Sequence, residues 1–172
     1  MKFIVSFLTI LLFSLAGICN AEITGTVVDA ETGKPIEGAV VLVEWTITKG
    51  MPGMSHTESY KIIEGLTDKT GEIKILEIHN PLTNQPYITI YKKGYVTWNS
   101  EYIFPNYKKR TDFQRKEINV FKLEKFALEY KYQSHVSFIH HVIRLGVGEK
   151  KMMTEAIEWE ESKAFEERQK NK

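Results

Sequence analysis

The chain has 172 residues, with 23 Lys and Arg against 22 Asp and Glu, which gives a formal net charge of +1. This balance excludes a disordered polyelectrolyte, and it argues against nucleic acid as a partner because phosphate binding needs a basic excess. The single cysteine, Cys19, excludes an intrachain disulfide and a cysteine-rich zinc site. The length predicts one domain with a short appendage.

Residues 1–21 have the pattern of an export signal. A short basic start is followed by the apolar segment from Phe3 to Gly17, and the small residues Cys19 and Ala21 then occupy the −3 and −1 positions of a cleavage site. We expect cleavage after Ala21, a mature chain that begins at Glu22, and a periplasmic or secreted location. No stable membrane span is expected once the signal is removed.

Lipid anchoring through Cys19 is the alternative. A lipoprotein signal requires a small residue directly before the cysteine, and this chain has the bulky Ile18 there. The pattern therefore favours simple secretion.

Residues 22–125 read as a series of short strands separated by turns. The clusters at 29–35 and 67–71 combine Asp, Thr, Gly and Pro, which are turn residues. Segment 86–91 is expected to place Tyr87, Thr89 and Tyr91 on one face and Ile88 and Ile90 on the other, whereas 46–59 reads as a polar insertion. Strands are predicted at 22–28, 38–45, 60–66, 72–75, 86–91 and 117–125.

Four segments of this region resemble carboxypeptidase regulatory-like domains. The resemblance implies a mainly β fold, a seven-stranded antiparallel transthyretin-like sandwich over residues 22–125, and an accessory or binding role rather than catalysis. The segments are Ile23-x-Gly25-x-Val27-x-Asp29-x-x-Thr32-Gly33-x-Pro35-Ile36-x-Gly38-Ala39-x-Val41, Thr67-Asp68-x-Thr70-Gly71-x-Ile73, Ile88-x-Ile90-x-x-x-Gly94-Tyr95 and Phe121-x-Leu123.

Residues 126–172 lie outside the resemblance and read as two α-helices. The first carries an apolar stripe that includes Val136 and Ile139, with Ser134 as its predicted N-cap. The second is predicted at 149–168, with a narrower stripe that includes Met153 and Ile157. We expect the first helix to pack on the sandwich, and the second to pack weakly or to contact a partner.

The sequence lacks the motifs of the common hydrolases. It has no Gly-x-Ser-x-Gly elbow, no spacing that suggests a Ser-His-Asp triad and no His-x-x-Glu zinc motif. His135, His140 and His141 do not converge on one helix face, which argues against a metal site, and they are expected to be surface or boundary residues. The chain is therefore predicted not to be an enzyme.

A methionine-rich loop raises the possibility of a metal site. Met51 and Met54 flank Pro52-Gly53, a pair that suits the centre of a type II turn, and His56 follows closely. Thioethers and imidazole are ligands that suit Cu(I). Such loops resemble those of exported copper-handling proteins, so the alternative cofactor is copper, held by Met51, Met54 and His56.

An aromatic cluster is interleaved with lysines, and two interpretations are open. Its rings belong to the sandwich core and cover the sheet edge, or they form a ligand surface with Trp98, Tyr102 and Tyr107 as the candidate residues. The leading hypothesis is an exported, non-enzymatic β-sandwich that serves as a binding or accessory module of the bacterial cell envelope, with an envelope protein or a glycan as partner. One alternative is a periplasmic Cu(I)-binding protein. Another is a structural envelope protein that docks a partner through its C-terminal helices.

Overall fold

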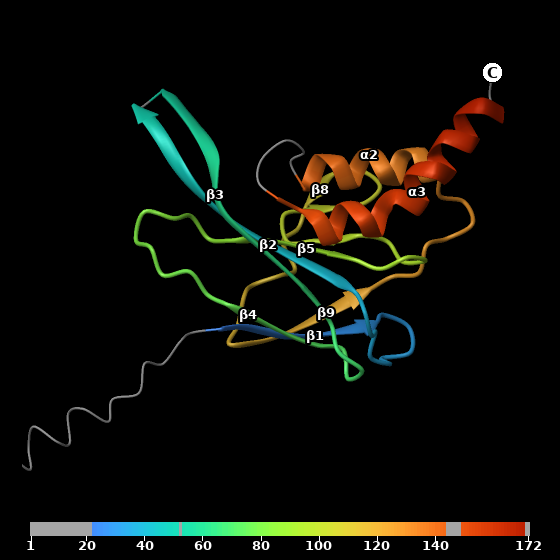
Figure 1. Ribbon diagram of the computed structural model, residues 1–172, viewed down its shortest axis with the longest axis horizontal. Coiled ribbons are helices and arrows are strands. Elements are labelled where there is room, and N and C mark those ends of the chain that lie inside the picture. Colours follow the sequence, from blue (N-terminus) through green and yellow to red (C-terminus); the bar gives the residue numbers. More distant parts are fainter. Residues whose placement is uncertain (1–21, 52, 144–148, 171–172) are drawn as a thin grey trace, which may run out of the picture.

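Two β-sheets packed face to face form the body of the protein, and two helices cover one of them (Figure 1). The computed structural model describes residues 22–51, 53–143 and 149–170, and the predicted signal peptide lies outside these ranges. The elements are β1 (Glu22–Asp29), β2 (Val40–Met51), β3 (Met54–Leu66), β4 (Glu72–Leu76), β5 (Tyr87–Tyr91), β6 (Trp98–Asn99), β7 (Tyr102–Ile103), β8 (Lys108–Lys109), β9 (Ile118–Leu123), α2 (Tyr132–Val142) and α3 (Lys151–Lys170).

The strand orders are β4-β1-β9 in the first sheet and β3-β2-β5-β6 in the second, while β7 and β8 form a small sheet of their own. The two main sheets have three and four strands, and their total of seven is the number predicted for the sandwich. The prediction of a purely antiparallel arrangement is wrong for one pair, because β9 lies parallel to β1. The long connection after β5 brings β9 back beside β1 in the same direction, which a hairpin cannot do.

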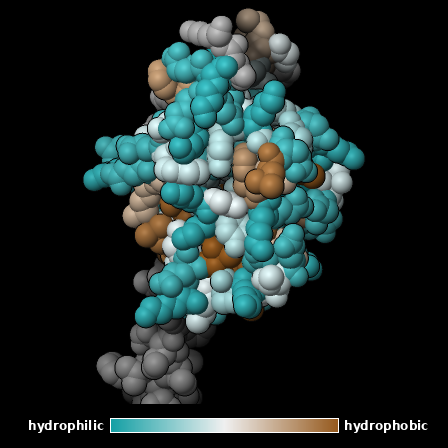
Figure 2. All heavy atoms as spheres, turned by 90° about the vertical axis from the view of Figure 1, so that its right-hand side faces the viewer, coloured by the Kyte–Doolittle hydropathy of each residue, from teal (hydrophilic) through white to brown (hydrophobic). Residues whose placement is uncertain are grey.

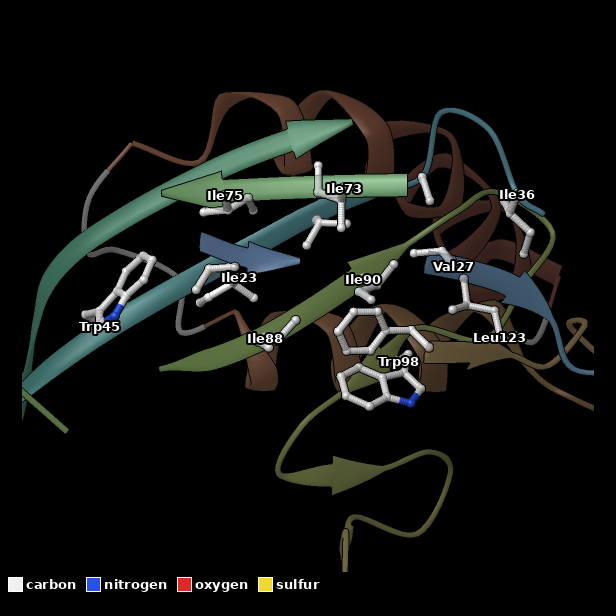
Figure 3. Packing of buried hydrophobic residues seen from close by; sticks show 14 residues of the cluster. Ile23, Val27, Ile36, Trp45, Ile73, Ile75, Ile88, Ile90, Trp98 and Leu123 are labelled. Atoms are coloured by element: carbon white, nitrogen blue, oxygen red, sulfur yellow. The ribbon is translucent and has the colours of Figure 1, made fainter. Parts of the chain in front are cut away.

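The core between the sheets follows from alternation along the strands. In β2, Val41, Val43 and Trp45 point into this space and are at most 2% exposed. Ile88 and Ile90 of β5 lie on the same side, as predicted, and Figure 3 shows them beside Trp98. The other buried members are Ile23, Val27, Ile36, Ala39, Ile73, Ile75, Phe121 and Leu123.

A second core lies on the other face of the same sheet, beneath α2 and α3. Val40 and Leu42 of β2 point to this side, so β2 is buried on both faces. Both helices therefore pack on the sandwich, and their apolar stripes are covered within the chain, although Phe165 of α3 remains 57% exposed. The buried members are Val40, Leu42, Tyr91, Val96, Phe104, Phe138, Ile139, Val142, Ile143, Met153 and Ile157.

Distant carboxylates cap both helices. The predicted N-cap Ser134 lies inside α2, which instead begins after Lys131, and Lys131 makes no side-chain capping bond. Two backbone N–H groups in the first turn of α2 donate to the carboxylate of Glu167 at 3.1 and 3.0 Å. Two in the first turn of α3 donate to Glu64 at 3.0 and 2.8 Å. These bonds tie α2 to α3 and α3 to β3.

The segment 46–59 is not an insertion but the outer part of a long β2–β3 hairpin, which projects beyond the sheets (Figure 1). Pairing continues from Val40 opposite Leu66 to Met51 opposite Met54, with one irregularity after Trp45. The described residues from Thr48 to Thr57 are all exposed, so this outermost stretch has no buried face and its sequence shows no alternation of apolar and polar residues.

The face shown in Figure 2 is largely hydrophilic, with small and separate apolar patches. Neither helix in the described ranges is long and apolar enough to span a membrane.

Candidate functional site

A groove of about 900 Å³ opens between the outer part of the β2–β3 hairpin, the start of β5 and the segment 109–115. Most of the side chains that line it carry hydroxyl, amide or charged groups, and the rings of Tyr87 and Phe113 complete it. Such a lining offers hydrogen-bond donors and acceptors to a polar ligand. The lining residues are Thr48, Thr57, Asn84, Gln85, Pro86, Tyr87, Ile88, Ser100, Glu101, Lys109, Arg110, Phe113, Gln114 and Arg115.

Arg110 anchors one wall of this groove. Its side chain is 12% exposed, and its Nε donates to the backbone carbonyl of Asn99 at 2.7 Å. The guanidinium lies 4.8 Å from the ring centre of Trp98 and donates to the carboxylate of Asp112 at 3.2 and 3.3 Å. These contacts engage the guanidinium on several sides, so Arg110 holds segment 109–115 in place. Because Asp112 neutralises its charge, Arg110 attracts an anionic ligand only weakly.

Asn84 anchors the opposite wall. Its side-chain amide donates to the hydroxyls of Thr46 and Thr48 at 3.0 and 3.1 Å, and its backbone N–H donates to the Thr46 carbonyl at 2.7 Å. Nearby, the guanidinium of Arg115 lies 2.6 Å from the carboxylate of Glu77. The groove is therefore held by contacts between segments that are distant in the sequence, and its arginine charges are largely neutralised.

The predicted aromatic surface is divided between two parts of the molecule. Trp98 is only 8% exposed and packs in the sandwich core, with its ring centre 5.0 Å from that of Phe113. Tyr102 and Tyr107 lie beside α2, where each ring meets that of His141 at 5.3 and 5.2 Å. Tyr107, at 38% exposed, is the most exposed of the three predicted residues. The structure thus brings Tyr102 and Tyr107 together and places Trp98 elsewhere.

The predicted metal ligands lie at the tip of the β2–β3 hairpin. Met51 and Met54 occupy paired positions and are 72% and 80% exposed. Gly53 has φ 86°, which fits the second central position of a type II turn. His56 is paired across the hairpin with Lys49, and its Nε2 lies 2.9 Å from a carboxylate oxygen of Glu58. Among the described residues no group of three or more His, Cys, Asp or Glu forms a metal site.

A buried polar group that sequence reasoning missed joins the two helices to the sheet. His135, expected at the boundary, is fully buried, and its Nε2 accepts the backbone N–H of Thr97 at 2.9 Å. The ring proton therefore sits on Nδ1, which donates to Glu160 at 2.7 Å. His135 lies three residues after Tyr132 and four before Ile139, a spacing that places it on the apolar face of the helix.

Tyr91 lies next to this pair, in the layer between β5 and α3. Burial raises the pKa of its hydroxyl, and the charge of the Glu160 carboxylate raises it further. Tyr91, His135 and Glu160 are all at most 1% exposed, so none of them is accessible to a substrate. Their role in this arrangement is to hold the helices on the sheet.

No protein-family model and no curated protein matches the chain. Solved structures of pilins do. The shaft pilin SpaA from Lactobacillus rhamnosus GG matches at 13% sequence identity and a TM-score of 0.36, over 64% of this chain and 47% of the pilin. Its C-terminal domain matches at 13% identity and a TM-score of 0.34, over 62% of this chain and 98% of that domain. A streptococcal ancillary pilin matches at 16% identity and a TM-score of 0.34, over 62% of this chain and 29% of the pilin. This chain thus spans about half the length of the shaft pilin structure.

Proposed function

We propose that the chain is an exported, non-enzymatic binding module of the bacterial cell envelope, and that the groove beside segment 109–115 binds a glycan. The main support for glycan binding is the groove itself, which has a volume of about 900 Å³ and is lined by amide and hydroxyl side chains. Each amide group offers two donors and an acceptor, a combination that matches the hydroxyl groups of a sugar. The rings of Tyr87 and Phe113 add apolar faces.

The charges around the groove favour a ligand with little net charge. Asp112 neutralises Arg110, and Glu77 neutralises Arg115. Lys109 and Glu101, which also line the groove, carry one charge of each sign. A neutral polysaccharide suits such a lining better than a strongly anionic polymer does.

The location in the envelope and the absence of catalysis rest on different observations. Export is supported by the signal-like segment 1–21, and an accessory role by the resemblance of residues 22–125 to carboxypeptidase regulatory-like domains. A non-enzymatic role is supported by the full burial of the His135–Glu160 pair, which keeps this acid–base combination away from solvent. The intact mass of the protein from its native compartment tests export, with Glu22 expected as the first residue.

A titration with N-acetylglucosamine oligosaccharides, followed by amide NMR on residues 22–172, tests glycan binding. We expect shifts that cluster at the groove. We also expect them to be lost or several-fold weaker in the double variant Gln85→Ala/Gln114→Ala. Gln133→Ala, which removes an exposed amide on α2, is the matched control and keeps full binding. Shifts scattered over the surface, or equal binding by both variants, contradict the proposal.

A further inference from the structure

The tip of the β2–β3 hairpin gathers soft-metal ligands on one face. Side chains alternate between the two faces of a strand, and paired positions across a hairpin share a face. Met51 is paired with Met54, and Lys49 with His56, two residues further down each strand. Both thioethers and the imidazole therefore project from the same side of the ribbon.

The opposite face of the ribbon belongs to the groove. Thr48 and Thr57 are paired across the hairpin on that other face, and both line the groove. The methionine face is consequently directed away from the groove, and its role is independent of the proposed glycan site. The outer end of the hairpin also projects beyond the two sheets (Figure 1), so a small ion can approach its tip.

The distances within the hairpin suit a shared ion. Directly paired residues have Cβ atoms about 4.5–5.5 Å apart, and diagonal neighbours are about 7–8 Å apart. Two methionine side chains, each with three rotatable bonds, can bring both sulfurs to one ion from such positions. His56 lies next to Met54 on the same face and diagonally opposite Met51, so it can add a nitrogen ligand.

Glu58 already orients His56. One oxygen of its carboxylate lies 2.9 Å from Nε2 of the imidazole, and the other lies 2.6 Å from Nζ of Lys49. With the Nε2 proton directed to this carboxylate, Nδ1 keeps the lone pair that a metal needs. A histidine ligand whose second nitrogen donates to a carboxylate is a common arrangement in metal sites.

We propose that Met51, Met54 and His56 form a surface site for a soft monovalent cation, Cu(I) or Ag(I), with Glu58 as the positioning residue for the imidazole. Thioethers are soft, neutral ligands that favour Cu(I) over Zn²⁺ or Mg²⁺. The ammonium of Lys49 on the same face also disfavours a second positive charge on the ion. Both considerations select a monovalent ion.

The test uses Ag(I) as a redox-inert probe of residues 22–172 labelled with ¹³C at the methionine methyl groups. Met152, which is 43% exposed on α3, and the buried Met153 are internal controls in the same spectrum. We expect the methyl signals of Met51 and Met54 to shift together and to saturate at one Ag(I) per chain, while those of Met152 and Met153 stay in place.

Variants then test each ligand. We expect Met51→Leu/Met54→Leu, which keeps the apolar volume without the sulfurs, to abolish binding, and Met152→Leu to leave it unchanged. Glu58→Gln removes the carboxylate partner of His56, so it is expected to weaken Ag(I) binding about 10-fold or more. Competition with a Cu(I) chelator under reducing conditions repeats the comparison with Cu(I). Equal binding by the double-methionine variant, or equal shifts at Met152 and Met51, overturns the proposal.

Discussion

Nδ1 of His135 and a carboxylate oxygen of Glu160 lie 2.7 Å apart where α2 and α3 meet the sheet, and both side chains are fully buried. A second histidine–glutamate pair joins the same helices at the same distance, between His140 and Glu161, with side chains that are 34% and 41% exposed. The two pairs differ mainly in burial, and each can serve as the control for the other.

The first prediction uses this contrast. His135→Ala is expected to lower the free energy of unfolding by about 3–5 kcal/mol, because the carboxylate of Glu160 stays buried without its partner. Glu160→Ala is expected to lower it by about 1–3 kcal/mol, because it leaves only a neutral imidazole N–H unsatisfied. His140→Ala is expected to cost about 0–1 kcal/mol, since exposed pairs contribute little. Urea unfolding measures all three. The effects of His135→Ala and Glu160→Ala should be less than additive in the double variant, and simple additivity contradicts the coupling.

The second prediction concerns acid stability through Asp29. Its carboxylate accepts N–H bonds from Thr32 and Glu31 and O–H bonds from Thr32 and Tyr95. These bonds, led by the backbone bond from Thr32, lower the pKa of Asp29 from 3.8 to about 2. Above pH 3.8 the carboxylate is ionised in both folded and unfolded chains, so its stabilising effect is fully present there. Between pH 3.8 and about 2 the unfolded chain binds the proton first, and the effect is progressively lost.

Asp29→Asn is the corresponding variant. We expect it to melt at a lower temperature than the wild type at pH 7, and this difference in Tm to shrink as the pH falls from 4 towards 2. Thermal melts over this pH range provide the measurement. A difference in Tm that stays constant over the range contradicts the assignment to Asp29.

The third prediction compares two glycines with similar backbone angles. Gly71 has φ 73° and Gly33 has φ 68°, so alanine is strained at both positions. A Cβ on Gly71 would lie 2.5 Å from the backbone carbonyl oxygen of Val27, whereas one on Gly33 would meet nothing within 4 Å. Gly33→Ala is expected to cost about 1–2 kcal/mol from the backbone angle alone. Gly71→Ala should cost clearly more, because the backbone around it must shift. Equal costs in denaturant unfolding contradict the proposed clash.

Much of the sandwich could be predicted because its strands have one buried face or dense turn signals. The clusters around Asp29 and Asp68 are real turns, in which each carboxylate accepts backbone N–H groups two or three residues later. The faces of β5 were also predictable, since Ile88 and Ile90 alternate with Thr89 and Tyr91. In both cases the determining interactions are local, so a single sequence window contains them.

The hairpin, the helix caps and the groove depend on partners far away in the chain. The capping carboxylates Glu64 and Glu167 are 34 or more positions from the N–H groups whose hydrogen bonds they accept, so no local pattern reveals them. The groove likewise depends on contacts such as that between Asn84 and Thr48, 36 positions apart. His135 and Glu160 were predictable in part, because both fall at apolar-face positions of their helices, but the sequence does not show that they face each other.

The double burial of β2 has a consequence for how this sequence can diverge. Neighbouring residues of β2 pack in different cores. Val41 packs in the core between the sheets, and Leu42 packs beneath the helices. A substitution in the helices must therefore fit against β2, and the position of β2 is also constrained by the packing of its alternate residues against the opposite sheet. The eight consecutive positions from Ala39 to Thr46 are all buried, and they form the stretch in which amino-acid substitutions are most restricted.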